Sequence, residues 1–268
     1  MKKLVLLLLC CALVSAAHVT VWNPVQDALE DGGSLNLGVI GPGQKVEIVI
    51  DRGSGEENPS GGEALWDRTI IEEATLPVGW TKEDGKFYES PMHAYVSAAK
   101  NAADGEYEFY LMVIDEYERA PTTRVKCSVV VSRDVFQSSL ANNIVVAGVD
   151  QPATYYLFLK NDSSASDSFE VTVKGLPGGL LEPRKVFVPY KSERLIAYPV
   201  SSSEAGSFAL EFNVKSLSSS GMNASLPAAL EAERSLYQDM RATSHGVLLF
   251  PSLQQVIYAL FGLTSNLK

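Results

Sequence analysis

From Val19 onward, short runs rich in Val, Ile, Tyr and Phe alternate with clusters of Gly, Pro, Asp and Ser. Within the runs, apolar and polar residues follow each other with a period of two, which is typical of strands with one buried face. The pattern predicts strands over residues 46–50, 107–114, 124–131, 154–159, 169–173, 185–188, 194–200 and 208–214. Turn residues precede two of them, Gly41-Pro42-Gly43 and Asp104-Gly105. Many short strands separated by turns predict an all-β sandwich architecture.

One order of features occurs twice along the chain. In the first copy, a turn at 41–44 and a strand are followed by the corner Leu-Pro-Val-Gly-Trp at 76–80 and by a Gly-led strand at 105–110. In the second, a turn at 149–152 and a strand are followed by Leu-Pro-Gly-Gly at 176–179 and a Gly-led strand at 206–210. The repeat predicts two tandem immunoglobulin-like β-sandwiches, over residues 18–133 and 134–216.

This order of short motifs resembles the Ig-like repeats of the CARDB and NEW3 kind, which occur as surface modules in bacteria and archaea. The resemblance covers roughly residues 19–216; the corner at 76–80 matches fully, whereas the corner at 176–179 lacks the final aromatic residue. It implies a spacer, adhesion or cell-surface module, and it carries no catalytic residues to transfer.

The N-terminus has the features of a secretory signal peptide. Lys2 and Lys3 precede an apolar run at 4–13, and small residues follow at 15–17. We expect a signal peptide over residues 1–17, with cleavage after Ala16 or Ala17. A retained N-terminal anchor is the alternative, although the apolar run is short for a membrane span.

The last fifty residues differ from the rest. A Ser-rich linker begins at 216–220, and apolar residues at near-helical spacing follow, with Ser225 as a candidate N-cap. We therefore expect residues 217–268 to form a linker and a short C-terminal α-helical segment. Residues 242–267 contain no Asp, Glu, Lys or Arg, and this stretch includes the apolar positions Leu253, Val256, Ile257, Leu260 and Phe261. Such a segment either attaches to a membrane or packs on the second sandwich or a neighbouring subunit.

Charge and cysteine content exclude several classes. The formal net charge is −10 and becomes −12 without Lys2 and Lys3. Because the chain is this acidic, it repels nucleic acid and anionic membrane surfaces, and neither of these polyanions is an expected partner. After signal cleavage Cys127 is the one remaining cysteine, so no intramolecular disulfide is expected. Cys127 lies in a stretch where apolar and polar residues alternate, which predicts that its side chain is buried like that of a small apolar residue.

No motif for catalysis is present. The three histidines, His18, His93 and His245, are isolated in sequence, and neither a nucleophile elbow nor a phosphate-binding loop occurs. We expect a protein that is not an enzyme and has no cofactor. A secreted hydrolase is a remote alternative that would need a pocket joining His93 to an acidic partner.

Three kinds of binding or modification site remain as expectations. Loop-bound Ca²⁺ is one interpretation of the acidic stretches Asp51, Glu56, Glu57 and Asp115, Glu116, Glu118, and solvated acidic loops are the favoured one. Trp66, at the end of a Gly/Glu-rich insertion, is the candidate contact with a glycan or partner. The glycosylation acceptors Asn161 and Asn223 lie in Ser-rich surroundings, and Asn161 is the favoured one.

These features predict a non-enzymatic, exported protein of the cell surface or extracellular space. Its Ig-like modules would be attached or assembled through the C-terminal helices, with a membrane or another envelope protein as partner there. Homo-oligomers are compatible with this arrangement. A carbohydrate-binding or adhesin module is the alternative function.

Overall fold

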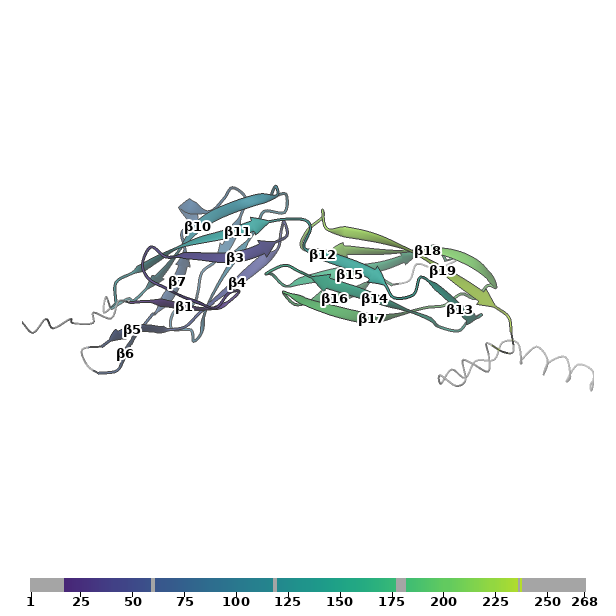
Figure 1. Cartoon of the computed structure of the whole chain (residues 1–268), viewed down its shortest axis with the longest axis horizontal. Coiled ribbons are helices and arrows are strands. Elements are labelled where there is room, and N and C mark those ends of the chain that lie inside the picture. The colour runs from purple at the N-terminus through teal and green to yellow at the C-terminus, as the bar shows by residue number, and fades with distance from the viewer. Residues whose placement is uncertain (1–16, 59–60, 118–119, 177–181, 236, 238–268) are drawn as a thin grey trace, which may run out of the picture. The chain divides into compact units, whose positions relative to one another are not determined.

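The computed structural model describes residues 17–58, 61–117, 120–176, 182–235 and 237. These residues form 19 strands and one short 3₁₀ helix, η1 (Glu73–Thr75). They divide into two compact units (Figure 1). Unit 1 comprises the described residues up to Gly38 together with those of Val46–Ser97 and Glu106–Val129. Unit 2 comprises the described residues from Val130 onward, together with the segments Val39–Lys45 and Ala98–Gly105.

Unit 1 contains two sheets and a separate hairpin. The first sheet has the order β2-β1-β4-β9-β8, and its strands are β1 (Val19–Asn23), β2 (Asp27–Leu29), β4 (Lys45–Ile50), β8 (Thr81–Glu83) and β9 (Met92–Ser97). The second has the order β3-β11-β10-β7, formed by β3 (Ser34–Ile40), β7 (Arg68–Ile71), β10 (Gly105–Ile114) and β11 (Thr123–Val131). The hairpin pairs β5 (Gly53–Glu57) with β6 (Glu63–Leu65).

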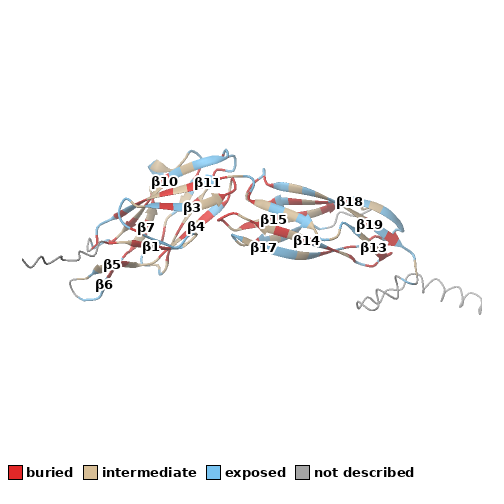
Figure 2. Cartoon of the chain, viewed as in Figure 1, coloured by how far each residue is buried: buried red, intermediate tan, exposed pale blue. Residues whose placement is uncertain are grey.

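The core of unit 1 follows from the period-two pattern. From Phe109 onward every second residue of β10 is fully buried, and buried residues alternate in the same way along β4, β9 and β11 (Figure 2). The buried positions of β10 are Phe109, Leu111 and Val113. Cys127 in β11 is also fully buried, as its surroundings predict.

Both predicted turns of the repeat form. The Gln44 amide donates to the Gly41 carbonyl at 3.1 Å, and the Gln151 amide donates to the Gly148 carbonyl at 3.0 Å. At the first corner the Trp80 amide donates to the Pro77 carbonyl at 3.1 Å. Gly79 there has φ +80°, a left-handed conformation that glycine adopts without a steric penalty. The second corner, at 176–179, lies largely outside the described residues.

Unit 2 is a sandwich of a three-stranded and a five-stranded sheet. The smaller sheet has the order β12-β14-β17, with β12 (Phe136–Leu140), β14 (Ala153–Asn161) and β17 (Ser192–Val200). The larger has the order β13-β19-β18-β15-β16, with β13 (Ile144–Gly148), β15 (Asp167–Lys174), β16 (Arg184–Val188), β18 (Gly206–Ser216) and β19 (Asn223–Glu233). All these pairs are antiparallel except β13 with β19, which is parallel.

Aromatic side chains fill the space between the two sheets of unit 2. The rings of Tyr155 and Phe212 lie 5.0 Å apart, and those of Tyr198 and Phe212 lie 5.5 Å apart in an edge-to-face arrangement. The Tyr155 hydroxyl donates to the Ala229 carbonyl at 2.7 Å, which ties β14 of one sheet to β19 of the other. The prediction of an all-β protein with immunoglobulin-like sandwiches is thus confirmed.

The prediction of a helix beginning near Ser225 is wrong for residues 223–233, which form β19. Leu226 and Leu230 are four residues apart, a spacing that suits one helical turn and equally two strand repeats. In the structure they lie on the core side of β19, which pairs with β18 from Asn223 to Ala232. Strand β19 accommodates Pro227 because β13 pairs only with residues 229–233. The N–H group that proline lacks is therefore not needed for the hydrogen bonds between β13 and β19. The second sandwich therefore extends beyond residue 216.

Two further predictions lie outside the described residues. The signal peptide falls there except for Ala17, and so does the apolar segment with Leu253, Val256, Ile257, Leu260 and Phe261. Among the residues that the structure does describe, no helix is long and apolar enough to cross a membrane.

Candidate functional site

The candidate site lies in unit 1, where the insertion at 53–66 folds into the β5–β6 hairpin. The Ser54 hydroxyl donates to the Ala64 carbonyl at 2.7 Å and closes this hairpin. Gly55 has φ +73°, and a Cβ there would collide with the ring of His18, so glycine is required at this point. The insertion is thereby held close to the start of β1.

A pocket of about 260 Å³ opens beside the hairpin. Its lining combines one guanidinium, three carboxylates, an amide, an aliphatic side chain and two phenols: Arg52, Asn58, Glu63, Leu65, Asp67, Tyr88, Asp115 and Tyr117. Three of these residues expose large apolar surfaces to solvent, namely Leu65 at 45%, Tyr88 at 48% and Tyr117 at 65%. The pocket is therefore polar inside and has an aromatic and aliphatic rim.

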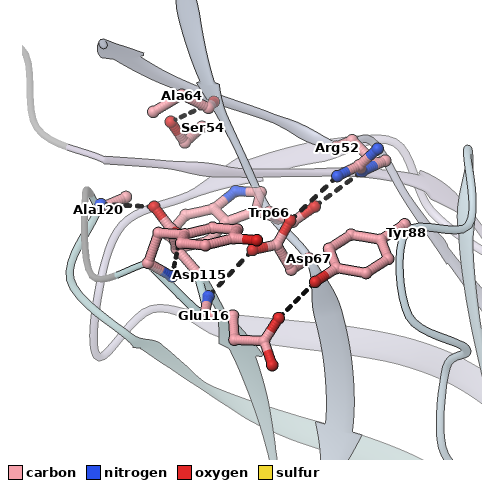
Figure 3. A network of polar contacts seen from close by, with 10 residues as sticks. Arg52, Ser54, Ala64, Trp66, Asp67, Tyr88, Asp115, Glu116 and Ala120 are labelled. Carbon is pink, nitrogen blue, oxygen red and sulfur yellow. Dashed lines mark hydrogen bonds and ion pairs between the residues drawn. The ribbon is translucent and has the colours of Figure 1, made fainter. Parts of the chain in front are cut away.

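The guanidinium of Arg52 is held in a fixed position (Figure 3). Its Nε donates to the Trp66 carbonyl at 2.8 Å, and its Nη2 donates to Oδ1 of Asp67 at 3.1 Å. The ring centroid of Tyr88 lies 5.8 Å from the guanidinium carbon. Arg52 and Asp67 retain 19% and 7% of their side-chain exposure, so the pair is screened from bulk water far more than a surface ion pair.

Asp67 joins three segments of the chain. Its second carboxylate oxygen, Oδ2, accepts the Glu116 amide at 3.0 Å, and its carbonyl accepts the Tyr88 amide at 2.9 Å. Asp115 is committed in the same way, since its two oxygens accept the amides of Tyr117 and Ala120, both at 2.9 Å. Both buried carboxylates act as structural acceptors that shape the loops around the pocket.

Tyr88 has an unusual backbone conformation, with φ +59°. A non-glycine residue in this region costs free energy and persists only where its surroundings hold it. Here the amide bond to Asp67 and a short hydrogen bond from the Tyr88 hydroxyl to the Glu116 carboxylate supply that restraint. The Glu116 carboxylate raises the pKa of Tyr88 because ionised tyrosine would lose this bond and face a negative charge.

Trp66 is not the surface contact that the sequence predicts. Its side chain is fully buried, and its indole Nε1 donates to the His18 carbonyl at 3.1 Å. The chain turns inward at the end of β6, so the ring fills the core under the hairpin while Leu65 beside it remains exposed. The exposed aromatic residues at the pocket are instead Tyr88 and Tyr117. No local sequence signal distinguishes these two tyrosines from core residues.

Asn161 is unsuitable as a glycosylation acceptor, contrary to the sequence prediction. Its side chain is fully buried at the end of β14. The Nδ2 atom, to which a glycan would attach, donates to the carbonyls of Ala165, Val188 and Pro189 at 2.9, 3.3 and 3.1 Å. The Asn161 side chain therefore stabilises the turn that the sequence pattern interprets as an open loop. Asn223 is exposed at the start of β19 and stays a prediction.

The structure also places His93 against an acidic residue. Its Nδ1 lies 2.9 Å from Oε1 of Glu47, and the Tyr95 hydroxyl donates to the same oxygen at 2.8 Å. This hydrogen bond raises the pKa of Tyr95 to about 12. The cluster is partly exposed, and His93 does not line the pocket beside the hairpin.

The acidic stretches do not form a metal cluster in the described part of the chain, where no three His, Cys, Asp or Glu side chains are grouped to hold an ion. Asp51 accepts the neighbouring Arg52 amide at 2.8 Å. The two oxygens of Asp115 accept amides as described above. Glu118 lies outside the described residues.

Comparison with known proteins finds similar chains among solved structures. No family model matches the chain, and no curated protein matches it. Among solved structures, a CARDB domain from Pyrococcus furiosus in complex with di-metal ions is 17% identical, with a TM-score of 0.28, covering 37% of this chain and 86% of that one. A chimeric titin Z1Z2 is 9% identical, with a TM-score of 0.37, covering 82% of this chain and 98% of that one. A β-glucosidase from Listeria innocua is 12% identical, with a TM-score of 0.26, over 36% of this chain and 16% of the enzyme. These likenesses concern the fold alone.

Proposed function

We propose that this chain is an exported, non-enzymatic interaction protein whose first sandwich binds a partner at the pocket beside the β5–β6 hairpin. The observation that carries the proposal is the combination of a fixed guanidinium with exposed apolar side chains around one pocket. Arg52 is positioned by Trp66 and Asp67, and Leu65 and Tyr117 form part of the rim. Binding sites commonly combine such a pre-organised polar group with an apolar surface.

The carboxylates near the pocket support binding rather than catalysis. Asp67 and Asp115 each use both oxygens as acceptors for the protein itself. Glu63 accepts the Gly55 amide at 2.9 Å, and Glu116 accepts the Tyr88 hydroxyl. General acid–base catalysis needs a carboxyl group that can reach a substrate proton, whereas these groups hold the loops in place.

The proposal is tested by screening the protein against displayed peptides and against a glycan array. The rim variant Leu65→Ser/Tyr117→Ser removes exposed apolar surface from the pocket without touching the buried core. The control Val78→Ser removes a 99% exposed apolar residue of the same unit that does not line the pocket. We expect ligands of the wild-type protein to lose at least about tenfold in affinity for the rim variant and to keep full affinity for the control.

The class of ligand found decides between the two functions. Peptide ligands support the interaction module, whereas glycan ligands that depend on Tyr117 support the carbohydrate-binding alternative. If every ligand binds the rim variant as tightly as the wild type, the pocket is not the binding site.

Attachment through the C-terminal segment is the second part of the proposal. It is supported by the apolar, nearly charge-free sequence of residues 242–267. The test compares full-length protein with a chain ending at Ser235, which retains β19, after alkaline carbonate washing of membranes from the native host. Resistance of the full-length form alone supports membrane attachment. Extraction of both forms excludes it and leaves packing or assembly as the role of this segment.

A further inference from the structure

A second groove lies in unit 2, between the strands β16 and β17. Each is the outermost described strand of its sheet, since β16 pairs only with β15 and β17 only with β14 (Figure 1). The groove between them has a volume of about 430 Å³ and is lined by residues 184–187 of β16 and 194–197 of β17. Unpaired strand edges of this kind accept an added strand readily.

Strand register shows which side chains face the groove from β17. Arg194 is paired with Leu159 and Ile196 with Leu157, and both leucines are fully buried. Cross-strand partners lie on the same face of a sheet, so Arg194 and Ile196 are on the core-facing side at the mouth of the groove.

The same argument applies to β16. Val186 is paired with the buried Phe169, and Arg184 with the buried Val171. The mouth of the groove thus has an apolar centre, Val186 and Ile196, with an arginine toward each end. Phe187 and Leu195 add exposed apolar surface on the outer faces, at 57% and 65% exposure.

The backbone of β17 presents hydrogen-bonding groups to this groove. The Tyr156 carbonyl, opposite Ala197, accepts the Ala141 amide and so faces away from β17. The backbone N–H and C=O groups of Ala197 therefore face the open edge of β17. The Ala197 carbonyl accepts a hydrogen bond from Nη1 of Arg184 at 2.8 Å. By alternation, the N–H and C=O of Leu195 face the groove as well. Pro199, two residues beyond Ala197, also faces the open edge, so the N–H group that proline lacks breaks no bond within the sheet.

We propose that this groove binds an acidic segment in extended conformation, which adds a strand to β17. Arg184 lies opposite Ala197, three residues along β17 from Arg194, or about 10 Å. Acidic side chains at positions i and i+4 of a strand lie on one face about 13 Å apart, within reach of two long arginine side chains. An apolar residue at i+2 would then contact Val186 and Ile196.

The positive charge of the groove favours an acidic segment over a neutral or basic one. The chain as a whole carries a formal net charge of −10, yet Arg184, Lys185 and Arg194 line a single groove. Guanidinium groups bind carboxylates through paired, charge-assisted hydrogen bonds. A partner with acidic residues at both ends of a short apolar stretch therefore complements the groove.

The test uses a fluorescein-labelled peptide of sequence TETLTET and its neutral counterpart TQTLTQT, with binding followed by fluorescence anisotropy. We expect saturable binding of the acidic peptide and at least about tenfold weaker binding of the neutral one. Arg194→Glu should weaken binding of the acidic peptide at least about tenfold. The control Lys215→Glu makes the same charge reversal at an exposed position on β18 and should change affinity less than about twofold.

Hydrogen exchange distinguishes strand addition from binding by side chains alone. With saturating peptide, the Leu195 and Ala197 amides should exchange more slowly, whereas amides of β18 should not change. Binding without this protection overturns strand addition. Absence of binding at millimolar peptide overturns the site and indicates that the arginines only protect the sheet edges. Self-association that Arg194→Glu abolishes would assign the groove to a second copy instead.

Discussion

Replacement of Asp67 by alanine is expected to destabilise unit 1 strongly, because this carboxylate connects the elements around the pocket. The substitution removes the acceptor for Arg52 at 3.1 Å and the acceptor for the Glu116 amide at 3.0 Å. It also leaves Arg52, whose side chain is 19% exposed, without its ionic partner. Asp67→Asn keeps the shape of the side chain and one oxygen acceptor, so it should cost less.

The magnitude follows from these losses. A hydrogen bond to a charged group contributes about 1.5–3 kcal/mol, and an unpaired, partly buried charge adds a further cost. Some water will reach the space left by Asp67 and recover part of this energy. We therefore expect Asp67→Ala to lower the free energy of unfolding by about 3 kcal/mol. For a domain of about 100 residues this corresponds to a fall in Tm of roughly 10–15 °C.

Tryptophan fluorescence isolates unit 1 for this measurement. The three tryptophans of the chain, Trp22, Trp66 and Trp80, all belong to unit 1. Thermal and urea unfolding followed at this signal therefore report on unit 1, while calorimetry follows both units. The control is Asp27→Ala, which removes an exposed carboxylate whose Oδ1 accepts the adjacent Ala28 amide.

The expected result is a lower Tm in the fluorescence transition for Asp67→Ala and a change within about 0.5 kcal/mol for the control. A loss below about 1 kcal/mol for Asp67→Ala would refute the reasoning, because the carboxylate would then contribute no more than an exposed ion pair.

Three further predictions concern other parts of the molecule. Arg124 lowers the pKa of Glu72 through a bidentate pair at 2.8 Å, so Glu72 contributes stability above its unfolded pKa that is lost as pH falls through its folded pKa. The difference in Tm between wild type and Glu72→Gln should accordingly shrink on acidification from neutral pH to about pH 3, and a constant difference would contradict this. Burial raises the pKa of the Cys127 thiol to about 12, so iodoacetamide at pH 8 should label it only after unfolding; rapid labelling of the native protein would show that it is accessible. Tyr155→Phe should cost about 1 kcal/mol in urea unfolding followed by circular dichroism, because the Ala229 carbonyl loses its donor, and an unchanged midpoint would show that the bond contributes nothing.

Local sequence was sufficient to locate eight of the 19 strands in the described part of the chain. Each predicted strand, such as 107–114 or 208–214, lies within the bounds of an observed one, here β10 and β18. The turns at Gly41 and Gly148 form where Gly and Asp supply the required backbone conformations. Period-two alternation is a local property that survives any arrangement of the sheets, because side chains on successive strand residues always point to opposite faces.

The same local reasoning failed where two interpretations share one spacing or one composition. Leu226 and Leu230 satisfy both a helix and a strand, and pairing with β18 decided for the strand. Asn161 lies in a stretch with the composition of an open loop. Its side-chain amide nevertheless donates to three carbonyls, which belong to the turn and to the end of β16.

What the sequence alone determined is the all-β class, the sandwich architecture and the positions of eight strands. Tertiary structure decided which residues are available to a partner. Trp66 and Tyr88 are both aromatic residues next to loops, but the inward turn after β6 buries the first, and a left-handed backbone held by Asp67 exposes the second. The two arginines of the unit 2 groove become neighbours only because β16 and β17 are edges of different sheets. Exposure and proximity depend on long-range pairing, which no local pattern encodes.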